Sequence, residues 1–127
     1  MEQGAGLSEL KLVVEDEPLV AMALDDSLTD SGYTVVGPAS SLKTGMRLIE
    51  EHAVDGAVLD VNLRGEMVFP LADALAKRSI PFVYVTGYGK LVRACNHGSP
   101  VLQKPYNVQQ LLNIIGQWRP RLPRRGW

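Results

Sequence analysis

The fold of this chain is constrained most by five short apolar runs that alternate with stretches of helical pattern. The runs are rich in Val, Leu and aromatic residues and occupy residues 10–14, 33–36, 57–60, 82–85 and 101–103. Runs of this length and composition are typical of strands that are buried on both faces of a sheet. Five strands separated by helices predict right-handed crossovers and one parallel sheet, and therefore an α/β fold.

Helical patterns fill the segments between the predicted strands. Pro18 suits the first turn of a helix, where its missing N–H costs nothing, and Gly32 suits the end of that helix. Ser40 or Ser41 can cap a second helix with apolar positions within residues 42–49. We expect two further helices at residues 68–77 and 111–118.

The composition indicates one soluble, cytoplasmic domain. A net charge of -1 gives no bulk attraction to nucleic acid or to an anionic membrane, and the lone cysteine cannot form an internal disulfide. No apolar run approaches the roughly 20 residues of a membrane helix, and the first residues lack the pattern of a secretion signal. We expect a leader at residues 1–7, one domain at residues 8–118, and an Arg- and Pro-rich tail at residues 119–127.

Polar residues lie at the carboxyl ends of four of the apolar runs. Asp16 lies after the first run, Asp60 closes the third, Thr86 follows the fourth and Lys104 follows the fifth. In an open parallel sheet, ligands bind outside the carboxyl ends of the strands, so these four side chains should meet in one cleft. A carboxylate pair, a hydroxyl and an ammonium together predict a phosphoryl-transfer site.

Three carboxylates would lie close together in that cleft, those of Glu15, Asp16 and Asp60. Like charges at such range repel unless a cation neutralises them, and Mg²⁺ suits a site of oxygen ligands. Asp60 could then be a metal ligand, or a nucleophile that forms an aspartyl phosphate while Mg²⁺ and Lys104 offset the phosphoryl charge. Thr86 would donate a hydrogen bond to a phosphoryl oxygen.

These motifs as a set resemble the receiver domain of bacterial two-component response regulators, over about residues 8–118. The resemblance implies a flavodoxin-like three-layer sandwich, with sheet order 2-1-3-4-5 and helices on both faces. It also implies a role for each residue of the cleft. Asp60 would be the phosphoacceptor. Asp16 and Asp60 would bind Mg²⁺ directly, Glu15 would bind it through water, and Asn62 would bind it through its backbone carbonyl. Thr86 and Lys104 would contact the phosphoryl group.

Two segments depart from the usual family pattern. Many members carry Tyr or Phe three residues before the lysine, where this chain has Val101, so the usual threonine–aromatic switch cannot operate in that form. Residues 81–89 resemble a subgroup of stand-alone receivers with a Phe-Ala-Thr-Gly-x-Tyr motif, although Tyr84 and Val85 replace Phe-Ala and Tyr88 comes one place early. We also expect a short helix at residues 90–95, which would become ordered when Thr86 engages phosphate.

The resemblance implies a Mg²⁺-dependent switch that accepts a phosphoryl group on Asp60 from a sensor histidine kinase. It would signal through an altered binding surface for a downstream protein, or pass the group to a histidine phosphotransfer protein. Because the receiver fills the chain, we expect no DNA-binding domain, no membrane attachment and no turnover of external substrates. Homodimerisation is common in such families and stays open here.

Two other classes of protein could carry a similar set of residues. A haloacid-dehalogenase-like phosphatase also uses Asp, Thr, Lys and Mg²⁺, but it needs a second Asp two residues after the nucleophile, where this chain has Asn62. Its nucleophile would also belong on the first strand. A phosphorylation-independent interaction domain would show no dependence on Mg²⁺.

Overall fold

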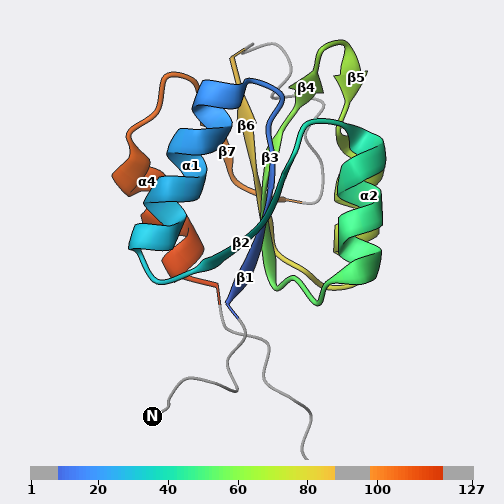
Figure 1. Cartoon of the computed structure of the whole chain (residues 1–127), viewed down its shortest axis with the longest axis horizontal. Helices are drawn as coiled ribbons and strands as arrows, with labels where there is room; N and C mark the ends of the chain where they lie inside the picture. Colours follow the sequence, from blue (N-terminus) through green and yellow to red (C-terminus); the bar gives the residue numbers. More distant parts are fainter. Residues whose placement is uncertain (1–8, 88–97, 119–127) are drawn as a thin grey trace, which may run out of the picture.

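A five-stranded parallel sheet forms the centre of the molecule (Figure 1). The computed structural model describes residues 9–87 and 98–118. The strands are β1 (Leu10–Val14), β2 (Thr34–Ala39), β3 (Gly56–Asp60), β6 (Phe82–Thr86) and β7 (Val101–Gln103). They lie in the order β2-β1-β3-β6-β7, and every neighbouring pair is parallel. The predicted order 2-1-3-4-5 is therefore confirmed, and the chain reverses its direction of travel across the sheet between β1 and β3.

Within the described residues, four helices cover the two faces of this sheet. They are α1 (Pro18–Asp30), α2 (Leu42–Glu51), α3 (Phe69–Lys77) and α4 (Val108–Gly116). Figure 1 shows α1 and α4 on one side of the sheet and α2 on the other. Of the described helices, none is both long and apolar enough to cross a membrane.

Two apolar clusters hold the three layers together. Alternate residues of each strand face opposite sides, as the pleat of a strand requires. The cluster beneath α1 and α4 includes Val13, Leu28, Val58, Val83 and Ile115. The cluster beneath α2 and α3 includes Leu12, Ile49, Leu59, Leu71 and Leu75. The expectation of a sandwich with helices on both faces is confirmed.

The helix ends agree with the sequence signals in most places. Pro18 lies in the first turn of α1, and Gly32 follows that helix with a φ of 95°, which a residue without Cβ adopts freely. Of the two candidate serines, Ser41 caps α2 by accepting a hydrogen bond from the Thr44 N–H. At the start of α4, Asn107 forms a capping box with Gln110, which was not predicted.

The second strand extends beyond the predicted residues 33–36. The observed strand continues to Ala39, and its pairing with β1 shifts between Leu12 and Val14. Since β2 is an edge strand, Pro38 can lie in it without removing a hydrogen bond from the middle of the sheet.

A short hairpin between β3 and α3 was not predicted. It consists of β4 (Asn62–Leu63) and β5 (Glu66–Met67), which pair antiparallel around a two-residue turn at Arg64 and Gly65. The predicted leader at residues 1–7, the predicted helix at residues 90–95 and the predicted tail at residues 119–127 lie outside the described residues.

A buried ion pair lies at the amino end of the sheet, away from the predicted cleft. The Lys11 ammonium binds the Asp55 carboxylate, and both residues are almost fully buried. Lys11 also lies 3.3 Å from Glu9 Oε1 and 5.1 Å from the centre of the Tyr33 ring. Burial raises the pKa of Asp55, although Lys11 opposes that shift.

We predict that Lys11→Met destabilises the protein by about 3–5 kcal/mol at pH 8, because it leaves the buried Asp55 carboxylate without its cation. The loss should be smaller at pH 5, where protonation removes the unpaired charge. Urea unfolding at the two pH values measures both quantities. The control is Lys43→Met, which removes the same charge from an exposed position on α2. An equal effect of the two substitutions would contradict the prediction.

Candidate functional site

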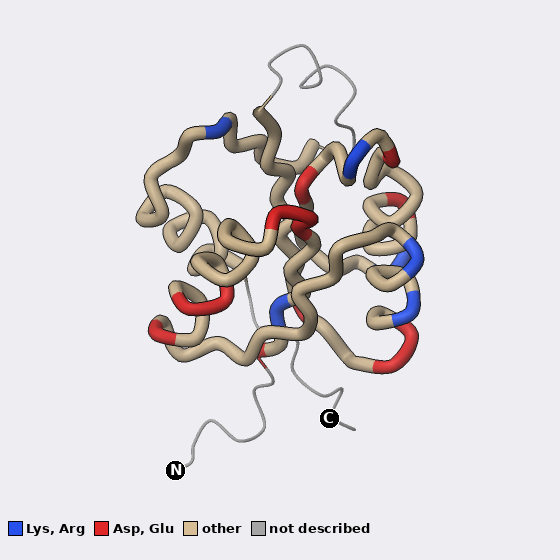
Figure 2. The backbone as a smooth tube through the Cα atoms, turned by 45° about the horizontal axis from the view of Figure 1, so that its top comes forward, with Lys and Arg blue, Asp and Glu red and all other residues tan. Residues whose placement is uncertain are grey.

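Three carboxylates converge at the carboxyl end of the sheet. Glu15 and Asp16 follow β1, and Asp60 is the last residue of β3, the neighbouring strand. One oxygen from each of the three carboxylates lies within 4.8 Å of the others. In Figure 2, acidic segments gather near the middle of this end of the molecule, with basic segments on either side. The predicted acidic cluster is thus present at the point where the strand order reverses, the place where open α/β sheets bind ligands.

Lys104 reaches this cluster from the far strand β7. Its Nζ lies 3.3 Å from Glu15 Oε1, 3.6 Å from Asp60 Oδ2 and 3.7 Å from Glu17 Oε1. Thr86, the last residue of β6, is buried, and its carbonyl accepts a hydrogen bond of 2.8 Å from the Lys104 N–H. The ends of β3, β6 and β7 therefore place Asp60, Thr86 and Lys104 next to one another, as the sequence predicted.

Asn62 begins the hairpin that follows β3. Its N–H donates a hydrogen bond of 3.4 Å to Asp60 Oδ1, and its side-chain oxygen accepts a hydrogen bond from the Gly65 N–H. Asn62 lines the same cleft as Asp60. The expected role of its backbone carbonyl as a metal ligand stays a prediction.

Two further charged residues of the site, Arg64 and Glu17, were not predicted. Arg64 Nε lies 3.3 Å from Asp16 Oδ2, and the N–H of Glu17 donates a hydrogen bond of 3.1 Å to Glu15 Oε2. Glu17 continues the acidic run that begins at Glu15, which was a usable signal. Arg64 offered none, because arginine is not a residue that marks a tight hairpin turn.

Among the described residues, the acidic cluster has more carboxylates than cations. Burial, and next the negative charge of Glu15, raise the pKa of Asp60 from 3.8 to about 7, against the opposing effect of Lys104. Burial would lower the pKa of Lys104, but the charges of Asp60 and Glu15 outweigh it and raise the pKa. Near neutral pH the buried carboxylates are therefore not fully neutralised by Lys104, and an additional cation would relieve their repulsion.

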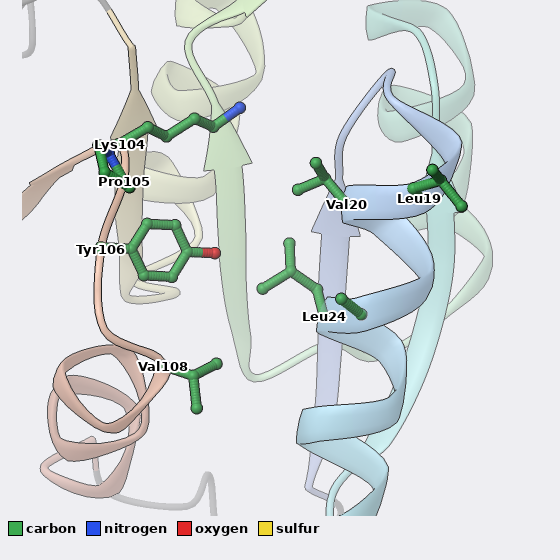
Figure 3. A pocket seen from close by; sticks show the side chains of 8 residues that line it. Leu19, Val20, Leu24, Lys104, Pro105, Tyr106 and Val108 are labelled. Carbon is green, nitrogen blue, oxygen red and sulfur yellow. The ribbon is translucent and has the colours of Figure 1, made fainter.

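Lys104 lies in the wall between two cavities of different character. The acidic cleft, of about 590 Å³, is lined by Asp16, Glu17, Asp60, Asn62, Arg64, Gly87 and Lys104. The second cavity, of about 640 Å³, we call the apolar groove. It lies between α1 and the loop that leads from β7 to α4 (Figure 3), and its lining is Leu19, Val20, Ala23, Leu24, Lys104, Pro105, Tyr106 and Val108.

Tyr106 points across the apolar groove toward α1, and the Lys104 side chain extends away from the groove toward the end of β3 (Figure 3). The Tyr106 ring packs against the core cluster beneath α1 and α4, which agrees with a packing role for this residue. Burial, followed by the charge of Glu15, raises the pKa of Tyr106. Leu19 and Val108 leave 80% and 41% of their surfaces exposed, so the rim of the groove is apolar.

Comparison with known proteins gives concordant matches. The transcriptional regulatory protein PdtaR of Mycobacterium tuberculosis is 30% identical over 109 residues, which cover 82% of this chain and 53% of PdtaR. TorR of Escherichia coli K12 is 38% identical over 124 residues, which cover 90% of this chain and 52% of TorR. The chain thus spans about half the length of these curated relatives.

Solved structures and a family model complete the comparison. SdrG from Sphingomonas melonis Fr1 is 39% identical, with a TM-score of 0.71, and the match covers 88% of this chain and 98% of SdrG. The PhyR receiver domain of Erythrobacter litoralis, at 23% identity and a TM-score of 0.80, shares the fold; that match covers 96% of this chain and 99% of the PhyR domain. The family model of the response regulator receiver domain matches residues 12–116. Since that match spans most of the sequence and every residue of the acidic cleft, this chain belongs to the response regulator receiver domain family.

Proposed function

We propose that this receiver accepts a phosphoryl group on Asp60 from the phosphohistidine of a histidine kinase or a histidine phosphotransfer protein. The observation that carries the proposal is the position of the Asp60 carboxylate. It lines an open cleft, it lies 3.6 Å from the Lys104 ammonium, and it stands beside two further carboxylates. A carboxylate in such surroundings is a nucleophile whose product can be stabilised by fixed charges.

In the proposed reaction a carboxylate oxygen of Asp60 forms a bond to phosphorus as the bond from phosphorus to the donor imidazole nitrogen breaks. The imidazole leaves with the electron pair of that bond, and Asp60 becomes an acyl phosphate. The Asn62 N–H, which donates to Asp60 Oδ1, orients the carboxylate. The Lys104 ammonium exchanges its contact with Asp60 for the phosphoryl oxygens, and the Thr86 hydroxyl donates to another of those oxygens.

The acidic residues fit a site for Mg²⁺. Their oxygens lie within 4.8 Å of one another, and the raised pKa of Asp60 indicates a deficit of positive charge. When bound, Mg²⁺ supplies positive charge against these carboxylates and the transferred oxygens. Glu15 is already held by the Glu17 N–H and by Lys104, which suits a ligand that acts through water, whereas Asp16 and Asp60 would bind directly.

We further propose that the chain is a stoichiometric acceptor and not an enzyme that turns over external substrates. An Asp-based phosphatase needs a second acid two residues after the nucleophile, and Asn62 occupies that position with its amide oxygen bound to the Gly65 N–H. An amide cannot transfer protons as a carboxylic acid does.

The apolar groove supplies a surface for the donor protein. A donor must bring its histidine to Asp60, so its footprint must border the acidic cleft. The groove does so, because Lys104 lines both cavities. Its exposed apolar rim offers surface that a partner can bury.

The phosphoacceptor assignment can be tested by intact mass. After incubation with acetyl phosphate and Mg²⁺ we expect one phosphoryl adduct on the parent protein and none on Asp60→Asn. The control Asp73→Asn, which changes an exposed residue of α3, should behave as the parent does. Omission of Mg²⁺ should abolish the adduct. SdrG, a similar protein, is described in a BeF3-activated conformation. Beryllofluoride is therefore a second probe of the site if acetyl phosphate reacts slowly. A phosphoryl adduct on Asp60→Asn equal to that on the parent would refute the assignment.

A pH profile tests the electrostatic state of Asp60 without any donor. The pKa of Asp60 is raised from 3.8 to about 7 in the folded protein. Between about pH 4 and pH 7, Asp60 is therefore protonated in the folded protein and ionised in the unfolded chain. The contribution of Asp60 to the free energy of unfolding of the metal-free parent should therefore fall across this range, by about 2–4 kcal/mol in total. Asp60→Asn lacks this titration.

The readout is the difference in unfolding free energy between Asp60→Asn and the parent, measured in EDTA by urea unfolding at several pH values. The difference should grow in favour of the variant from pH 4 to pH 8. If the unfolding free energies of the variant and the parent change in parallel with pH, the Asp60 carboxylate is not subject to the proposed repulsion.

A further inference from the structure

Arg64 occupies an unusual backbone position beside the acidic cleft. Its φ is 56° and that of the following Gly65 is 92°, so both residues of the hairpin turn are left-handed. This is the pattern of a type I′ turn, in which Asn, Asp and Gly are preferred. For a residue with a Cβ atom, such as arginine, that conformation costs roughly 1 kcal/mol or more.

The hairpin that presents Arg64 is anchored at several points. Leu63 is buried, the Val68 N–H donates to the Val61 carbonyl at 2.9 Å, and Glu66 Oε1 accepts a hydrogen bond of 3.3 Å from the N–H of Leu42 in α2. The Asn62 side chain holds the turn through the Gly65 N–H. The backbone of Arg64 is therefore fixed relative to the cleft, while its side chain remains 76% exposed.

Two cations divide the carboxylates of the cleft between them. Lys104 lies within 4 Å of Glu15, Glu17 and Asp60, whereas Arg64 pairs with Asp16 through Nε at 3.3 Å. A second guanidinium nitrogen of Arg64 lies 3.5 Å from the Asp16 backbone carbonyl. The Asp16 side chain is only 10% exposed, and the guanidinium lies against one oxygen of the carboxylate that a metal would need.

We propose that Arg64 is a tethered counter-ion that competes with the divalent cation for Asp16 and thereby lowers the affinity of the cleft for Mg²⁺. The inference rests on the proposed function, because it takes Asp16 as a ligand of the metal. A guanidinium and a divalent ion cannot both occupy the open side of one carboxylate without strong repulsion. Metal binding therefore requires the Arg64 side chain to leave Asp16 for solvent.

The expected size of the effect follows from the exposure of the pair. An ion pair with one well-exposed partner, here the 76% exposed Arg64, is weak and is screened by salt, so Arg64 should reduce Mg²⁺ affinity by about three- to tenfold and should not abolish binding. The reduction should also shrink as the salt concentration rises. A purely structural role of Arg64 in the hairpin would not produce that salt dependence.

The test is a Mg²⁺ titration of the whole chain without any phosphoryl donor, with the melting temperature as the readout of binding. The variants are Arg64→Gln, which removes the charge but keeps a side chain in the turn, and Arg64→Lys, which keeps the charge. The control is Arg47→Gln, which removes an exposed arginine that pairs with Glu51 on α2. Melting temperatures in EDTA establish that each variant is folded.

We expect Arg64→Gln to bind Mg²⁺ about three- to tenfold more tightly than the parent at low salt, with the two affinities converging at high salt. Arg64→Lys should lie between them, and Arg47→Gln should match the parent. Mg²⁺ binding by the parent with equal or weaker binding by Arg64→Gln would overturn the competition while leaving the proposed function intact. Absence of binding by both would count against the metal site itself, and the competition would fall with it.

Discussion

Repulsion among the buried carboxylates governs the arrangement at the carboxyl end of the sheet. The fold brings Glu15, Asp16 and Asp60 together because β1 and β3 are neighbours and parallel, and their strand ends leave little solvent to screen the charges. Two cations reduce this repulsion by pairing with the carboxylates: Lys104 extends from the end of β7, and Arg64 extends from the hairpin. At the opposite end of the sheet, the Lys11 ammonium binds the buried Asp55 carboxylate and also lies 3.3 Å from the more exposed Glu9.

Most of the site could be predicted from the sequence because its residues are tied to strand ends. The apolar runs that end at Asp60 and Thr86 are buried along their whole length, and strands buried on both faces give the clearest sequence signal. The run before Lys104 gave the bounds of β7 correctly, although that strand is partly exposed. Once five strands alternate with helices, the geometry of a parallel sheet brings their carboxyl ends to one edge without further information.

The features that were missed depend on tertiary contacts, which the sequence does not display. The strands of the hairpin have two residues each, too few for a periodic pattern, and their turn contains an arginine against local preference. Anchoring by Leu63 and Val68 overrides that preference. The continuation of β2 through Pro38 likewise depends on the strand lying at the edge of the sheet, which is a property of the assembled fold.

The shared position of Lys104 between the acidic cleft and the apolar groove has a thermodynamic consequence. Under the proposed function, a phosphoryl group on Asp60 would draw the Lys104 ammonium away from Glu15. Because Lys104 lines both cavities, this one side chain would couple them. Such coupling is reciprocal at equilibrium. A protein that binds the groove more tightly in one position of Lys104 must favour the corresponding state of Asp60 by the same factor. Occupation of the groove would then set how much of the receiver is phosphorylated, as well as report it.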